Sequence, residues 1–309
     1  MNRQTVAALT AVAVGIGVEQ AVREYRAEEL LRLRGPWRRM GGGRGPTGRG
    51  VGRGRGFHRR GGALTLEAQI IAAYEAVGWT VFFLGLSRDE DDFVLVGSAV
   101  DTWIDRSGLG NDALQPVGAA RPTFGLTAIN GLPGFTLDGG DWLLTGGIAI
   151  PSAVAYATHQ VVSVTGGGTR FLTEWGAFVG TTVRPVALGT NAYRADGKGN
   201  VGLSQALSDT SLTLTTPAVV RNTFDTTLAT LEAKIWHNGV DIGDTQPADA
   251  DNATGLVSGQ AITIGAAAGG GSFRMSGAIG AQVNAAGPST LPLAAAAEVD
   301  ALLAAQWAI

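Results

Sequence analysis

Short apolar runs separated by Gly, Asn, Asp and Pro recur along residues 63–309 and predict a protein built from β-strands. Most runs are about as long as a strand, and the polar breaks come too often for ordinary helices. This frequency of strands and turns predicts an all-β fold, with two antiparallel sheets in a sandwich of the jelly-roll type. The runs that read as strands are 94–96, 135–137, 142–144, 154–164, 171–172, 201–207, 212–220, 231–237, 261–264 and 273–283.

Three further segments of this body have a pattern of their own. Asn238-Gly239 lies between the alternating segments 234–237 and 240–242, and a two-residue hairpin turn needs the positive φ angles that Asn and Gly adopt most readily. Residues 291–307 are rich in Ala and Leu with Pro292 near their start, which predicts one C-terminal helix. Residues 63–76 fit either a short helix or a strand.

The first 62 residues follow a different pattern. Residues 5–34 begin with a small apolar stretch, become amphipathic and stop at Gly35-Pro36, which predicts a helix. Residues 35–62 hold 12 Gly and 8 Arg, a composition that cannot bury a core and predicts an extended arm. The expected parts are an anchoring helix at 1–34, a Gly/Arg-rich arm or linker at 35–62 and a jelly-roll domain at 63–309.

The net charge of −3 conceals a division between these parts. Residues 1–62 hold 13 Arg and 4 Glu, whereas residues 63–309 hold 10 basic and 22 acidic residues. The arm is therefore expected to lie along an acidic partner surface, with nucleic acid, which RGG-like arms contact at phosphate, as the alternative partner. The expected anchoring contacts are Trp37, Arg38, Arg39, Arg44, Arg49, Arg53, Arg55, Phe57, Arg59 and Arg60.

The apolar stretch at 5–18 has a second interpretation as an export signal, although Glu19 and Gln20 stand where a small-residue cleavage site would be expected. A membrane-spanning helix needs about 20 apolar residues, and this run is shorter. We expect a helix that packs against protein partners rather than a membrane span.

The segment Trp103–Ala113, WIDRSGLGNDA, is close to the W-x-D-x-S-G-x-G-N-x-A motif of laminin-G-like, concanavalin-A-like jelly-roll domains. The segments 121–123, 129–133 and 135–143 continue the resemblance in the family's order. The Trp236-x-Asn238-Gly239 hairpin, the strand at 262–265 and the terminal helix ending at 302–309 fit the same pattern. The resemblance covers roughly residues 66–309 and implies the sandwich fold that the strand pattern also predicts.

Domains of this kind serve as lectins, adhesins, glycosidase modules and virion parts, and they are frequent in tailed-phage structural proteins behind an attachment segment. The resemblance therefore implies a structural protein of a virion, anchored to capsid or tail proteins through residues 1–62 and displaying its jelly roll as decoration or for adhesion to a cell-surface glycan. By analogy it implies a homo-oligomer, with a trimer as the common case. The alternatives are a secreted or surface bacterial lectin, a glycan hydrolase and a nucleic-acid-binding virion protein.

The residues that could carry enzyme chemistry are few. The chain has no Cys and three well-separated His, which excludes thiolate zinc sites and HExxH-type sites. The body has six Glu and lacks the E-x-D-x-E pattern of related glucanases, so we expect no enzyme; Glu174 and Glu232 are the carboxylates to test for a hidden pair.

Two kinds of ligand contact are expected instead. Trp142, Trp175 and Tyr193 are possible platforms for a sugar ring, since aromatic side chains present an apolar face beside polar groups. No cofactor is certain, but calcium is the best candidate, because Asp89, Asp91 and Asp92 form an acidic loop of hard oxygen ligands. Asp105, Asn111 and Asp138 fit turn chemistry better, in which short polar side chains accept local backbone N–H bonds.

Overall fold

A computed structural model describes residues 64–149, 154–176, 182–188, 191–208, 212–243, 245–252, 259–267, 270 and 272–309. Residues 61–309 form one compact unit. The helix expected at 5–34, the arm at 35–62 and all ten anchoring residues lie outside the described residues.

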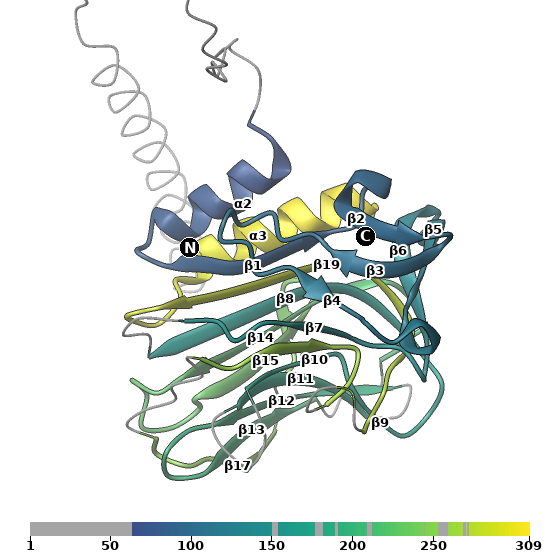
Figure 1. Cartoon of the computed structure of the whole chain (residues 1–309). Helices are drawn as coiled ribbons and strands as arrows, with labels where there is room; N and C mark the ends of the chain where they lie inside the picture. Colours follow the sequence, from purple (N-terminus) through teal and green to yellow (C-terminus); the bar gives the residue numbers. More distant parts are fainter. Residues whose placement is uncertain are drawn as a thin grey trace, which may run out of the picture. The chain divides into compact units, whose positions relative to one another are not determined.

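The described strands form two antiparallel sheets, as the strand pattern predicts (Figure 1). In sheet I, β19 is central, with β8, β14, β15 and β16 in order on one side and with β1, β6 and β5 on the other. The strands of sheet I are β1 (Thr80–Leu86), β5 (Thr123–Ile129), β6 (Leu132–Asp138), β8 (Ala155–Thr165), β14 (Ala218–Asp225), β15 (Ala233–His237), β16 (Val240–Asp241) and β19 (Ser276–Gly287).

Sheet II runs in the order β2, β3, β4, β7, β18, β10, β11, β12, β13 and β17, with β9 beside β11. One pairing between β3 and β5 connects it to sheet I. Its strands are β2 (Phe93–Val96), β3 (Ala99–Trp103), β4 (Ala113–Leu114), β7 (Leu143–Thr145), β9 (Thr169–Phe171), β10 (Thr173–Gly176), β11 (Thr182–Leu188), β12 (Ala192–Lys198), β13 (Leu203–Leu207), β17 (Thr245–Ala248) and β18 (Ile262–Ile264).

Two helices cover the outer face of sheet I. They are α2 (Leu66–Glu75), which settles the ambiguous segment at 63–76 as a helix, and α3 (Leu293–Trp307), which confirms the C-terminal helix. The Thr65 side chain caps α2 by accepting a hydrogen bond from the N–H of Ala68. Figure 1 shows α2 and α3 side by side above β1 and β19. Two short 3₁₀ turns, at Glu90–Asp92 and Gly118–Ala120, complete the described elements.

Two hydrophobic layers follow from the alternation of side chains along the strands. Between the sheets, Tyr156 of β8 meets Trp175 of β10 edge to face, with 5.5 Å between ring centroids. Between sheet I and the helices, Val283 of β19 packs in one cluster with Leu303 and Trp307 of α3. The sheet is therefore buried on both faces wherever the helices cover it.

The turn at Asn238-Gly239 is confirmed, with φ of 51° and 78° at its two residues and His237 paired to Val240. The motif at 103–113 is a tight turn organised by Asp105, whose carboxylate accepts hydrogen bonds from the N–H groups of Leu84, Ser107 and Asn111. This confirms the expected turn chemistry of Asp105.

Candidate functional site

A cavity of about 210 Å³ lies on the outer face of sheet I, beside the start of α3. Residues two apart on a strand share a face, so β14 presents Arg221, Thr223 and Asp225 to it, and β15 presents Lys234 and Trp236. Arg221 is paired in register with Trp236, and Thr223 with Lys234. This volume holds on the order of ten water-sized groups.

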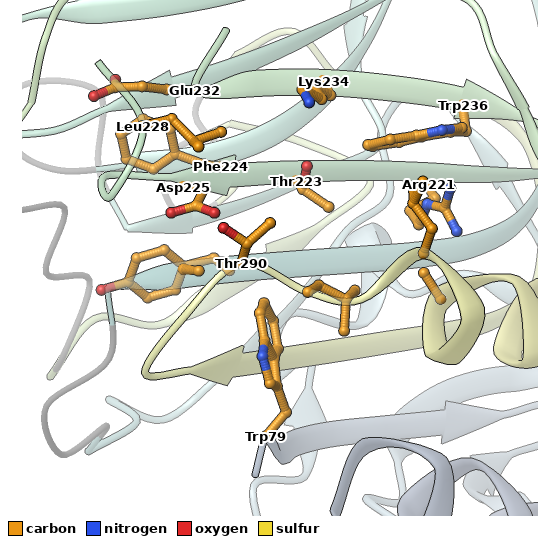
Figure 2. Close-up of a pocket in the computed structure, with 15 residues that line it drawn as sticks. Trp79, Arg221, Thr223, Phe224, Asp225, Leu228, Glu232, Lys234, Trp236 and Thr290 are labelled. Carbon is orange, nitrogen blue, oxygen red and sulfur yellow. The ribbon is translucent and has the colours of Figure 1, made fainter. Parts of the chain in front are cut away.

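The opposite wall of the cavity comes from distant parts of the chain. Trp79, which precedes β1, and Thr290 and Leu291, which precede α3, line it together with Ala296 of that helix. Figure 2 shows Trp79 and Thr290 across from Thr223. The lining is mainly apolar with a few polar groups, which is the usual composition of a small-molecule site.

Three buried polar atoms on this lining have no hydrogen-bond partner among the described residues. They are the indole Nε1 of Trp79, the guanidinium Nε of Arg221 and the Oδ2 of Asp225. The other carboxylate oxygen of Asp225 accepts hydrogen bonds from the N–H and the hydroxyl of Thr227. A buried polar group without a partner costs about 1–3 kcal/mol, so these three atoms, on residues that line the cavity, are polar groups whose bonding the described residues leave incomplete.

Arg221 is held in place by a buried network. Its Nη1 donates to Asp300 at 2.7 Å, and its guanidinium lies 4.1 Å from the centre of the Trp236 ring. The other oxygen of Asp300 is 2.7 Å from Nδ1 of His159, whose Nε2 is 2.5 Å from the Tyr74 hydroxyl. The network therefore connects one wall of the cavity to both helices.

Burial sets the protonation of this network. It lowers the pKa of His159 below its ordinary value, although the charge of Asp300 acts in the opposite direction. A neutral His159 donates a hydrogen bond from Nδ1 to Asp300 and accepts one at Nε2 from the Tyr74 hydroxyl, so each of its ring nitrogens has a partner. Burial also raises the pKa of Tyr74, which keeps its hydroxyl a donor.

Glu232 is one of the two carboxylates that we singled out for testing, and it lies at the edge of the same cavity. One of its oxygens accepts the N–H of Asn252 at 2.6 Å, and the other accepts Nδ2 of Asn252 at 2.6 Å and the hydroxyl of Ser204 at 2.7 Å. Three hydrogen bonds fix this carboxylate, so its position is structural as well as cavity-lining.

Glu174 lies elsewhere, on the outer face of sheet II. Arg184 bridges Glu174 and Asp196, with N–O distances of 3.0 and 2.9 Å, and Arg194 and Gln205 also donate to Asp196. The structure does not bring Glu174 and Glu232 into one cavity.

The prediction that Trp175 and Tyr193 are sugar platforms is wrong. Both side chains are fully buried in the layer between the sheets, where no sugar ring can reach them. Trp142 is half-buried, with its ring over Gly270, and it does not line the cavity. The cavity's aromatic groups include Trp79 and Trp236, neither of which stood out in the sequence as a platform for a sugar ring.

The calcium site expected at Asp89, Asp91 and Asp92 stays a prediction, and the structure gives two of these three carboxylates other partners. Asp92 is buried and paired with Arg88 and Arg106, at N–O distances of 3.1 and 2.9 Å, so its charge is already compensated. Asp89 accepts a hydrogen bond from the N–H of Asp91 and caps the 3₁₀ turn. Within the described ranges, no three His, Asp or Glu side chains come together in a way that could hold a metal ion.

No described helix is both long and apolar enough to cross a bilayer.

Comparison of folds finds similar sandwiches in other proteins. Domain 4 of an extracellular arabinanase from Geobacillus stearothermophilus, solved in complex with arabinotriose, matches 72% of this chain and 99% of its own, with 12% identity and a TM-score of 0.49. A pentraxin from Limulus polyphemus matches 51% of this chain and 73% of its own, with 12% identity and a TM-score of 0.38. Trypanosoma rangeli sialidase matches 72% of this chain and 32% of its own, with 14% identity and a TM-score of 0.46. No family model and no curated protein sequence matches the chain.

These comparisons correct one expectation. We expected no enzyme because the body lacks the E-x-D-x-E pattern, and the comparisons contradict this expectation, since the similar sandwiches include those of a sialidase and an arabinanase. At this level of identity the likeness concerns the fold, and function has to be argued from the site.

Proposed function

We propose that the body of this protein binds a saccharide in the cavity between β14, β15 and the start of α3. The observation that carries this proposal is the set of three unpartnered polar atoms on one apolar cavity, at Trp79, Arg221 and Asp225. Sugar hydroxyls both donate and accept hydrogen bonds, so one ligand can donate a hydrogen bond to Asp225 and accept hydrogen bonds from the nitrogen atoms of Trp79 and Arg221. The aromatic rings at the cavity offer a surface for the C–H face of a sugar.

A titration with simple sugars tests this proposal. Methyl glycosides of glucose, galactose and mannose, and arabinotriose, would be added to the full chain while tryptophan fluorescence and ligand NMR signals are recorded. We expect a fluorescence change, because Trp79 and Trp236 line the cavity. New anomeric signals in the same spectra would reveal cleavage of a glycosidic bond, so the experiment also detects a glycosidase.

A blocking variant makes the test specific. Thr223→Trp would fill the centre of the cavity from β14 and is expected to abolish binding. Thr245→Trp, at an exposed position of β17 in sheet II, is the matched control and is expected to bind as the parent does. Equal binding by both variants would contradict the proposed location.

We also propose the setting in which this body works, namely a virus particle to which residues 1–62 attach it. Support comes from the sequence, where a Gly/Arg-rich basic segment adjoins an acidic body. Many copies on one particle would make weak sugar contacts effective through avidity. Mass spectrometry and antibody labelling of purified particles test this, and a processed protein found in the medium instead would favour a secreted lectin.

A further inference from the structure

A second and larger hollow lies on the outer face of sheet I, beyond the C-terminal end of α3. Its volume is about 570 Å³, which is within the usual range of small-molecule sites. The helix ends over β6, where Nε1 of Trp307 donates to the carbonyl oxygen of Pro133 at 3.0 Å, and the hollow lies further along that strand, at Thr136. We call this hollow the sheet I groove.

The floor of the groove is a row of short side chains in register across four strands. Thr136 of β6 pairs with Thr123 of β5 on one side and with Ala278 of β19 on the other. Ala278 pairs in turn with Ser163 of β8. The residues that alternate with them along the strands face the layer between the sheets, so these four side chains face outward.

Ser163 is a buried polar group that the described residues leave without a hydrogen bond. It is 8% exposed, and its hydroxyl faces the groove. Unlike the unpartnered atoms of Trp79, Arg221 and Asp225, this hydroxyl oxygen keeps accessible surface. A hydroxyl both donates and accepts, so Ser163 indicates a ligand that forms hydrogen bonds at this end of the row.

The groove carries a negative charge. Asp138 and Asp141 line it; burial raises the pKa of Asp141, and the neighbouring charge of Asp138 acts in the same direction. Arg121, the cation of the lining, forms an ion pair with Asp101. Arg274 opposes the shift at Asp141, but it donates to two backbone carbonyl oxygens. Three carboxylates thus stand against two guanidinium groups, which leaves one negative charge for a ligand to balance.

We propose that the sheet I groove binds an amino sugar, with its ammonium group at Asp138 and its hydroxyl groups on Thr136 and Ser163. Asp138 follows Thr136 by two residues on the same face of β6, about 7 Å away, so one ligand can reach both. The ammonium group donates to the carboxylate and balances its charge, and the sugar hydroxyls exchange hydrogen bonds with the row. A neutral sugar leaves that charge unbalanced, and an anionic one is repelled. This site is separate from the cavity of the proposed function, so either can fail without the other.

The experiment compares ligands that differ in one group. Methyl glycosides of glucosamine and galactosamine are compared with those of glucose and galactose, and cyclohexylammonium serves as an ammonium ligand without hydroxyl groups. Binding is measured by calorimetry on the full chain at about pH 6.5, where the ammonium group and the carboxylates are charged. We expect at least one amino glycoside to bind to Thr223→Trp, in which the first cavity is filled. Adding Thr136→Trp, which fills the groove from an exposed position, is expected to abolish that binding.

Two substitutions with the same change of net charge complete the test. Asp138 and Asp89 are both exposed, and each accepts a hydrogen bond from the N–H two residues further on, a bond that asparagine can keep. Asp138→Asn is expected to weaken binding of the amino glycoside about fivefold, whereas Asp89→Asn is expected to leave it unchanged.

Four results would overturn the amino-sugar site and leave the proposed function standing. They are no binding of an amino glycoside to Thr223→Trp, equal binding of a neutral partner to that variant, equal binding of cyclohexylammonium, and equal affinities of Asp138→Asn and Asp89→Asn. Failure of every neutral glycoside to bind the parent chain would instead count against the first cavity alone.

Discussion

Replacing Asp300 with Asn tests the reasoning about the buried network most directly. Asp300 and Arg221 are both nearly inaccessible to solvent, and Asp300 is the charge that compensates Arg221. The asparagine amide would keep a similar shape but leave the guanidinium charge buried without a counter-charge. Burial lowers the pKa of Arg221 and Asp300 opposes this effect, so the substitution removes the stabilising part of the balance.

Removing one partner of a buried ion pair destabilises a protein by about 3–5 kcal/mol. For a domain of this size each kcal/mol lowers the melting temperature by about 2–4 °C, which predicts a decrease of roughly 6–20 °C. Thermal unfolding followed by circular dichroism measures it. Glu298→Gln removes the same charge from an exposed position of the same helix and is expected to change stability by less than about 0.5 kcal/mol.

A second substitution separates the charge from the shape. Combining Asp300→Asn with Arg221→Met removes the uncompensated charge and keeps an unbranched side chain against Trp236. The double variant is therefore expected to melt above Asp300→Asn alone. A decrease of less than about 2 °C for the single variant, or a double variant no more stable than the single one, would refute the argument from buried charge.

Three other predictions concern the buried network, the cavity and the packing between the sheets. The pKa of His159 in the folded protein lies below the ordinary value of 6.5, so the free energy of unfolding is expected to decrease as the pH falls below about 6.5, because the unfolded chain then binds a proton that the folded chain does not. The slope is at most about 1.4 kcal/mol per pH unit and can be measured by melting curves between pH 7.5 and 5. Identical pH profiles for the parent and His159→Gln would contradict this prediction. Asp225→Asn removes a buried charge with one unpartnered oxygen, so it is expected to raise the melting temperature and to weaken sugar binding. An unchanged affinity in the fluorescence titration would contradict this prediction. Gly197→Ala places a Cβ 2.1 Å from the ring of Phe224 and is expected to lower the free energy of unfolding in urea by about 1–3 kcal/mol. The control Gly167→Ala meets no atom within 4 Å and is expected to leave that free energy nearly unchanged. Equal effects of the two substitutions would contradict the tight packing at Gly197.

The parts of the fold that local pattern determines could be predicted from the sequence. The strand at 154–164, the Asn238-Gly239 turn and the C-terminal helix all depend on periodicity or on turn chemistry within a few residues. The strand expected at 212–220 covers 218–225 in the structure. The prediction ended it too early because Arg221, Asn222 and Asp225 interrupt the apolar run from which a strand is recognised. Their polar side chains are satisfied by tertiary partners such as Asp300, which local sequence does not show.

The candidate site could not be predicted for the same reason. Its walls come from Trp79, β14, β15 and the segment before α3, so the cavity exists only when residues more than 200 positions apart meet. The aromatic residues chosen from local sequence, Trp175 and Tyr193, are apolar enough to be buried and are buried. A signal that could have indicated the site is the alternation of Arg221, Thr223 and Asp225 on one strand beside Lys234 and Trp236 on the next.

The central place of β19 in sheet I has a consequence for how the chain is made. Thr80 of β1 pairs with Ala286 of β19, and β8 also depends on β19 along its whole length. A ribosome delivers residues 276–287 only after nearly all of the body has left it. Until then β1, β6 and β8 present unpaired edges, so the nascent sheet must be kept from pairing with neighbouring chains. Emergence of β19 from the ribosome, rather than translation of the early strands, is therefore the step at which this fold can close.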